Sequence, residues 1–168
     1  DALNGLAFFH LKWEQYEKAS DYAQELLEIS KKFPQSDVEG INATLGEIYA
    51  HQKKVKKALG YYQKVLDARM ETPERKKLAS GTLSDMGNVY YKVGKYDSAR
   101  IYYLRGVEIA QTYKDHRSLG FLKDNIGLAL KHEDRLTEAL EWQKEAIFHR
   151  RVVGSQLGVI TSLNNMAE

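Results

Sequence analysis

The side chains that could do acid–base or metal chemistry are the five histidines and the carboxylates. A shared metal ion needs ligands within a few ångströms, as in the HExxH helix motif, and His132 lacks the second histidine of that motif. His116 and His149 have no partner at ligand spacing along the chain. Asp85 and Asp124 lie far apart in the sequence, in different copies of a repeat of about 40 residues, so the sequence does not support a catalytic pair of carboxylates. The sequence therefore predicts no catalytic residue, no metal site and no cofactor.

Composition excludes several other functions. The 168 residues include no cysteine, which removes disulfides, thiolate zinc sites and thiol catalysis. Lysine and arginine total 25 against 23 acidic residues, and this net charge of +2 lacks the basic excess typical of nucleic-acid-binding proteins. No apolar run is long enough to span a membrane, and no signal-peptide pattern is visible. We expect a protein or peptide partner and favour a cytoplasmic location.

The elements that would position any functional residue repeat along the chain. A small residue recurs about every 40 residues, and an alanine follows it twelve positions later. These pairs are Ala7 with Ala19, Gly46 with Ala58, Gly87 with Ala99, and Gly127 with Ala139. Ala167 would be the fifth such anchor residue. We expect repeats over 1–35, 36–73, 74–114 and 115–154, with a partial repeat over 155–168.

Each repeat is predicted to contain two helices. In the third repeat, Leu83, Met86 and Tyr90 continue an apolar stripe at helical spacing, and Gly94 ends that helix. A second stripe starts at Tyr96.

Three sets of residues are typical of helix starts. Ser36 with Glu39 predicts a capping box, and Thr72 before proline predicts a cap with a first-turn proline. Asp134 is expected to cap the helix after it.

Glycine in three anchor positions implies close packing. A glycine inside a helix costs roughly 1 kcal/mol relative to alanine, so another contact must offset that cost. We expect the anchors Gly46, Gly87 and Gly127 to face the matching small residues of the second helix, Ala58, Ala99 and Ala139.

These columns resemble the tetratricopeptide repeat. That family places glycine or alanine early in its first helix, tyrosine three residues later and alanine early in its second helix, as in Gly87, Tyr90 and Ala99. His10 and Leu130 depart from the tyrosine column. The period near 40 is similar to the long repeats of kinesin light chains and of bacterial signalling proteins. The resemblance implies an all-α, right-handed α-α superhelical solenoid of antiparallel helix pairs.

In this family the first helices line a concave face that binds peptides. Transferred position by position, the resemblance implies the following contact residues: Asn4, Phe8, Lys12, Glu47, His51, Ser84, Asn88, Tyr91, Lys92, Phe121, Asp124, Leu128, Lys131, His132 and Asn164. Asn88 and Lys92 lie one turn apart and form the best pair for a peptide backbone or carboxylate. Phe8 replaces the asparagine of the family's carboxylate clamp, so binding of chaperone C-terminal tails is not expected.

The predicted function is a non-enzymatic scaffold that binds a peptide or protein segment in this groove. The alternative is a regulatory input region of a bacterial sensor kinase or transcription regulator. Residues 155–168 have the pattern of a first helix without its second, so we expect a fragment of a longer protein. Leu157, Ile160 and Leu163 would be partly exposed on that helix, and a homodimer through it is an expected possibility.

Overall fold

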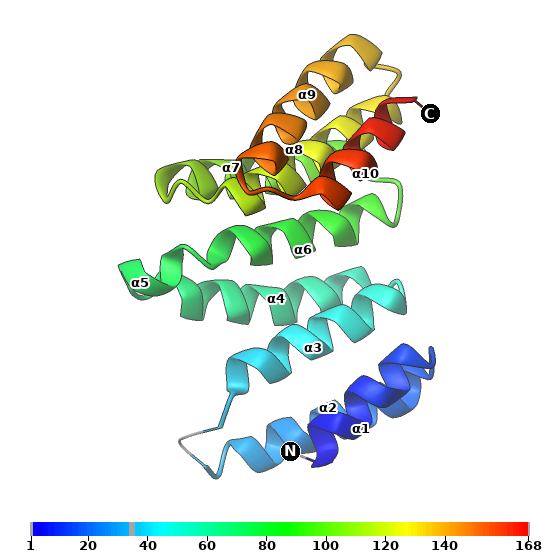
Figure 1. The fold of residues 1–168 in the computed structure, drawn as a ribbon. Helices are drawn as coiled ribbons and strands as arrows, with labels where there is room; N and C mark the ends of the chain where they lie inside the picture. Colours follow the sequence, from blue (N-terminus) through cyan, green and yellow to red (C-terminus); the bar gives the residue numbers. More distant parts are fainter. Residues whose placement is uncertain (1, 34–35, 168) are drawn as a thin grey trace. The chain divides into compact units, whose positions relative to one another are not determined.

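The computed structural model describes residues 2–33 and 36–167, with the side chains of residues 2–4 left out. Within these ranges the chain consists of helices and turns, without a β-strand (Figure 1). The helices are α1 (Ala2–Lys12), α2 (Tyr16–Ser30), α3 (Val38–His51), α4 (Val55–Met70), α5 (Pro73–Lys76), α6 (Ala79–Tyr91), α7 (Tyr96–Thr112), α8 (His116–Lys131), α9 (Leu136–Val152) and α10 (Gln156–Ala167). The predicted all-α fold of antiparallel helix pairs is confirmed. The side chain of Asn4 and the whole of Pro34 lie outside the described part of the chain.

Residues 1–68 form one compact unit, the N-terminal unit. In it α1 packs on α2, and α2 packs on α3. The alanines of the repeat are fully buried there: Ala7, Ala19 and Ala58 have no exposed surface. Gln24 on α2 donates a hydrogen bond from Nε2 to Oη of Tyr49 on α3, which ties the two helices together.

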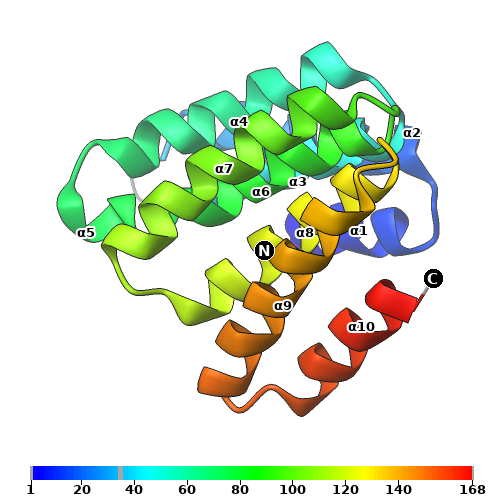
Figure 2. The same cartoon turned by 90° about the horizontal axis from the view of Figure 1, so that it is seen from above.

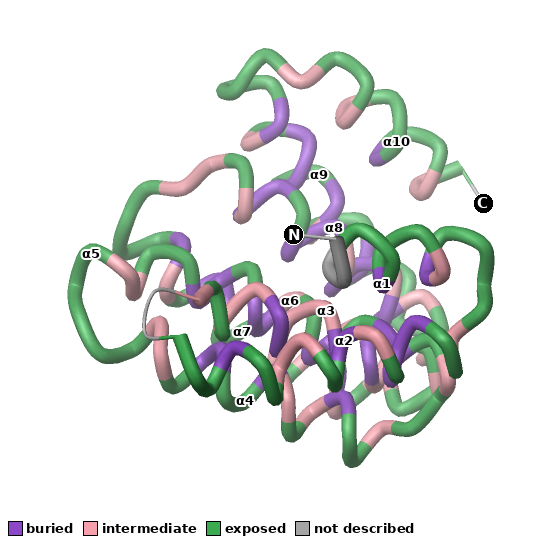
Figure 3. The backbone as a smooth tube through the Cα atoms, turned by 90° about the horizontal axis from the view of Figure 1, so that it is seen from below, coloured by how far each residue is buried: buried purple, intermediate pink, exposed green. Residues whose placement is uncertain are grey.

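Residues 69–168 form the C-terminal unit. Helix α6 pairs with α7, α8 pairs with α9, and α7 packs on α8. Helix α10 packs beside α9, as Figure 2 shows. Buried and exposed residues alternate along these helices (Figure 3), which is the amphipathic pattern that predicted them. The central core cluster comprises Ala99, Tyr103, Val107, Ala110, Leu119, Leu122, Ile126, Leu130 and Ala139.

The backbone conformation also repeats along the chain. The residue seven positions after each anchor adopts a left-handed conformation, with φ of 58° at Glu14, 56° at Lys53, 74° at Gly94 and 58° at Asp134. Each lies in the turn between the two helices of a repeat. Glycine is the residue that adopts this conformation without strain, and it occupies this position in the third repeat alone.

We expect Gly94→Ala to lower the free energy of unfolding of the C-terminal unit by about 1 kcal/mol, because a Cβ is unfavourable at positive φ. Nothing lies within 4 Å of the added Cβ, so the effect reports backbone strain alone. Urea denaturation followed by circular dichroism measures it. Lys114→Gly, at φ 54° in the same unit, is the reverse control and should not destabilise. An unchanged midpoint for Gly94→Ala would refute the strain at this turn.

The predicted helix caps are partly wrong. Asp37, one residue after the expected Ser36, caps α3, and its Oδ1 accepts from the backbone N of Gly40 at 2.8 Å. Asp134 is not a cap, because it occupies the left-handed turn position and α9 begins after Arg135. The Thr72 cap is confirmed, but it starts α5, a separate four-residue helix before α6.

The nearest neighbours of the anchor glycines differ from the expected alanines. A Cβ added to Gly46 would lie 2.8 Å from Cε1 of Tyr62, and one added to Gly127 would lie 2.7 Å from Cγ of Gln143. The large side chain sixteen positions after the anchor therefore covers each glycine, and at Gly127 the backbone oxygen of the expected Ala139 also lies 3.1 Å from the added Cβ. The close packing itself is confirmed.

Candidate functional site

The N-terminal unit contains an open groove of about 890 Å³ between α1, α2 and α3. Its lining residues are Gly5, Phe8, Leu26, Ile29, Ser30, Ser36, Asp37, Gly40, Ile41 and Thr44. The walls are largely apolar, and Phe8 is 53% exposed. No heavy atom lies within 4 Å of a Cβ built on Gly5, so the groove is open above the α1 backbone. Such a surface can receive apolar side chains of a partner.

The other predicted residues of this unit lie on the same two first helices. Lys12 is exposed, and its Nζ lies 5.7 Å from the centre of the Phe8 ring. Glu47 is exposed on α3. The ring of His51 stacks on Tyr16, with 5.3 Å between the centroids, so His51 packs on the preceding repeat. Among the predicted residues of this unit whose side chains the structure describes, Phe8 is the one that lines the groove.

In the C-terminal unit, several predicted contact residues bond to one another or to the core. Oδ1 of Asn88 accepts a hydrogen bond of 2.8 Å from Oη of the buried Tyr103. Oη of Tyr91 lies 2.9 Å from Nε2 of His132. The His132 ring also stacks on Tyr96 of the preceding repeat, with 4.4 Å between centroids. His132 therefore joins the third and fourth repeats, and Asn88 joins the two helices of the third repeat.

Burial agrees with this packing role. Burial, and then the neighbouring Tyr96, raise the pKa of Tyr91, so its hydroxyl stays protonated beside His132. Burial also raises the pKa of Tyr103, which keeps its donor for Asn88.

Asp124 was expected on the accessible face, but the structure buries it. It is 3% exposed, and its Oδ2 lies 3.0 Å from Nη2 of Arg150 and 3.0 Å from Nδ2 of Asn165. A carboxylate in this position connects α8, α9 and α10 instead of meeting solvent. Lys131 likewise donates from Nζ to the backbone oxygen of Asn165 at 2.7 Å.

The remaining predicted residues of this unit are open to a partner to different degrees. Lys92 and Asn164 are exposed, and Ser84 and Leu128 are half-buried. Phe121 is 58% exposed, and the Arg150 guanidinium lies 5.2 Å from the centre of its ring. An exposed phenylalanine supported by a cation is a suitable apolar contact.

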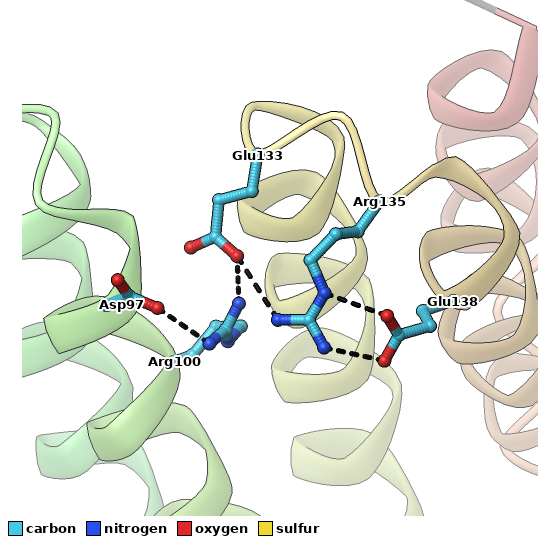
Figure 4. Close-up of polar contacts among 5 residues, drawn as sticks. All are labelled: Asp97, Arg100, Glu133, Arg135 and Glu138. Atoms are coloured by element: carbon cyan, nitrogen blue, oxygen red, sulfur yellow. Dashed lines mark hydrogen bonds and ion pairs between the residues drawn. The ribbon is translucent and has the colours of Figure 1, made fainter.

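A charged network joins α7 to the turn between α8 and α9 (Figure 4). Arg100 pairs with Asp97 at 2.8 Å and with Glu133, and Glu133 also lies 3.4 Å from Nη1 of Arg135. Arg135 holds both carboxylate oxygens of Glu138, at 2.7 and 2.8 Å. Each of these carboxylates has a cationic partner, so we interpret the network as a structural contact that connects the helices.

The expectation that His116 and His149 have no partner is wrong. Their Nδ1 atoms lie 2.8 Å apart, although the residues are separated by 33 positions. The signal that could have paired them is topological: His116 is the first residue of α8, His149 lies in the last turn of α9, and these ends meet in an antiparallel hairpin.

Within the described ranges, no three or more histidine, aspartate or glutamate side chains are placed to share a metal ion. In the same ranges no helix is both long enough and apolar enough to cross a membrane. The exposure expected on α10 is confirmed for Leu157, Ile160 and Leu163.

Known proteins show the same architecture. The family model described as "Tetratricopeptide repeat" matches residues 37–112. Human tetratricopeptide repeat protein 19, mitochondrial, is 24% identical over 157 residues. That match covers 92% of this chain but 41% of the human protein, so the chain spans about two-fifths of that relative's length.

Solved structures agree at the level of the fold. A putative kinesin light chain from Podosopora anserina with nearly identical TPR-like repeats superposes with a TM-score of 0.75 at 15% identity, over 99% of this chain and 82% of that one. Bacillus thuringiensis PlcR, solved with the peptide PapR7 and DNA, superposes with a TM-score of 0.73 at 16% identity, over 89% of this chain and 54% of that one. Residues 37–112 therefore match the tetratricopeptide repeat, and the solved structures share the fold of stacked helix pairs over most of the chain.

Proposed function

We propose that this chain is a non-catalytic scaffold that binds a peptide or protein segment along the first helices of its repeats. The observation that carries the proposal is the apolar groove of the N-terminal unit, where Phe8, Leu26, Ile29 and Ile41 surround an open space of about 890 Å³. A groove built from rigid helices is ordered before binding, so little entropy is lost on its side.

The chemistry of the groove points to the kind of segment. Apolar walls favour one or two bulky apolar side chains, as in an amphipathic helix or an extended strand with alternating apolar residues. Ser36 and Asp37 lie at the rim and can accept hydrogen bonds from a peptide backbone or a basic side chain. PlcR, which shares the fold, was solved with a bound peptide, and this supports a peptide as ligand.

Phe8→Ala is expected to weaken binding about tenfold, because truncation of an aromatic hot-spot residue that becomes buried in an interface costs more than about 1 kcal/mol. The probe is a peptide enriched from a phage-displayed 12-residue random library on the whole chain, with the affinity measured by calorimetry. Gly5→Leu should block the groove, since its side chain enters open space.

Phe9 provides the matched control for this experiment. It is the next residue of α1 and is 54% exposed, close to the value for Phe8, but it does not line the groove. Phe9→Ala should leave the affinity unchanged. If Phe8→Ala and Gly5→Leu bind the enriched peptides as tightly as the unaltered chain does, the groove assignment fails.

In the predicted pair of Asn88 and Lys92, a substitution of Lys92 tests binding with less effect on folding. Lys92 is exposed, whereas removal of the Asn88 amide would leave the buried Tyr103 hydroxyl without its acceptor. Loss of binding in an Asn88 variant would therefore mix a contact effect with a folding effect.

The alternative role, an input region of a bacterial signalling protein, involves the same groove. PlcR was solved with both a peptide and DNA, and this is the observation that favours this alternative. The two roles differ in what is joined to the repeats. A kinase or DNA-binding region in the same reading frame would decide for the input role.

A further inference from the structure

The fourth repeat places an imidazole where the other repeats have apolar side chains. The position 22 residues after the anchor is occupied by Ile29, Ala68, Ile109 and, in the fourth repeat, His149. Packing of the hairpin is satisfied by an aliphatic residue there, so the imidazole is a departure that packing does not require. The side chain that His149 meets is a second imidazole, that of His116.

We propose that His116 and His149 bind a divalent transition-metal ion that prefers square-planar or tetragonal coordination, such as Cu²⁺ or Ni²⁺, through their Nδ1 atoms. Two imidazoles from the two ends of one helical hairpin supply adjacent ligands. Water or a ligand from another molecule fills the remaining positions.

The separation of the two nitrogens allows one ion to bind both. With metal–nitrogen bonds of about 2.05 Å, adjacent ligands lie about 2.9 Å apart at right angles and about 3.3 Å apart in a tetrahedron. The Nδ1 atoms here are 2.8 Å apart, and the ring centroids are 5.0 Å apart. Rotation of each ring about its Cβ–Cγ bond turns both lone pairs towards one point and brings the nitrogens to such a separation. The preference for Cu²⁺ over Zn²⁺ follows from the order of divalent-ion affinities at nitrogen ligands.

The test uses the metal ion alone with the whole chain. Titration with Cu²⁺ at neutral pH should show one site per chain, and electron paramagnetic resonance should show coupling to two imidazole nitrogens. Ni²⁺ should raise the melting temperature, because it binds the folded hairpin and not the unfolded chain. His149→Ile, which restores the residue of the third repeat and so keeps the hairpin packed, should weaken binding by at least about tenfold.

Matched controls come from the other histidines. His51→Ala and His132→Ala remove rings that stack on tyrosines, and they should leave Cu²⁺ affinity unchanged. His116→Ala should match His149→Ile. The proposal is overturned if His116→Ala and His149→Ile bind Cu²⁺ as the unaltered chain does, if the spectrum shows a single nitrogen, or if Zn²⁺ binds more tightly than Cu²⁺.

Discussion

Substitution of Gly87 by alanine is expected to lower the free energy of unfolding of the C-terminal unit by about 2 kcal/mol, even though alanine is the better helix former. A Cβ at this position would lie 2.5 Å from Cδ1 and 2.9 Å from Cζ of Tyr103. The tyrosine is 1% exposed and its hydroxyl donates to Asn88, so the ring has no room to move away. The overlap must be relieved by shifting α6 from α7.

Gly81 is the internal control for this prediction. It lies in the same helix α6, is exposed, and a Cβ there would meet a single atom, the Nη1 of Arg69, at 4.0 Å. Gly81→Ala should therefore stabilise the unit by up to about 1 kcal/mol through helix propensity alone. Denaturant unfolding of both variants gives the comparison. Equal and favourable shifts for Gly81→Ala and Gly87→Ala would show that the glycine–tyrosine contact is not tight.

A double-mutant cycle identifies the contact. Tyr103→Ala alone should cost about 3–5 kcal/mol by opening a cavity. When it is combined with Gly87→Ala, the total loss should fall short of the sum by about 1–3 kcal/mol, because the new methyl then has space. The first repeat already has this combination in the same register, with Ala7 at the anchor position and Ala23 sixteen residues later, both buried.

The sizes of the anchor residue and of the residue sixteen positions later depend on each other, and this explains which part of the fold could be predicted from the sequence. The anchors form a column of small residues, either glycine or alanine, and so the period and the helix pairs were visible in the sequence. The residues sixteen positions after the anchors vary more widely, because Ala23, Tyr62, Tyr103 and Gln143 belong to three types of very different size. Their common property is a volume that complements the anchor, which only the structure reveals. The prediction therefore chose the alanine column, which is uniform but is not the main contact.

The candidate site, too, could be predicted from the sequence only in part. The family pattern predicts which positions face one side of the first helices, and of these Phe8, Lys92 and Phe121 are exposed. It cannot tell which polar side chains are already bonded within the chain. Asn88 accepts from Tyr103, and Asp124 pairs with Arg150, a residue 26 positions away on α9. Such pairs depend on distances between helices, and a single sequence contains no direct record of those distances.

Arg150→Ala is expected to be as damaging as Tyr103→Ala, with a loss of about 3–5 kcal/mol, because it leaves the Asp124 carboxylate buried without its cation. Arg150 also donates to the backbone oxygen of Gly158 on α10. Its stem passes between two glycines: a Cβ on Gly120 would lie 2.9 Å from its Cγ, and one on Gly158 would lie 3.0 Å from its Cδ. Hydrogen exchange should show α10 opening first.

An exposed arginine gives the contrast. Arg135 makes two hydrogen bonds to Glu138 on the surface (Figure 4), where water competes for both charges. Arg135→Ala should leave the unfolding midpoint almost unchanged. If Arg150→Ala is tolerated equally well, the buried pair does not hold α10 in place. Replacement of both partners, Asp124→Leu with Arg150→Met, should recover most of the loss, since no buried charge is left unpaired.

The pH dependence of Arg150→Ala separates loss of charge pairing from loss of packing. Burial raises the pKa of Asp124 in the folded chain, and Arg150, Ser162 and Asn165 oppose that rise. Without Arg150 the opposition weakens, so the folded state binds the proton still more tightly than the unfolded state does. Stability then falls as pH rises between the unfolded and folded pKa values. The variant's deficit should therefore shrink in mildly acidic buffer, where Asp124 is neutral, whereas a deficit caused by lost packing alone would stay constant with pH.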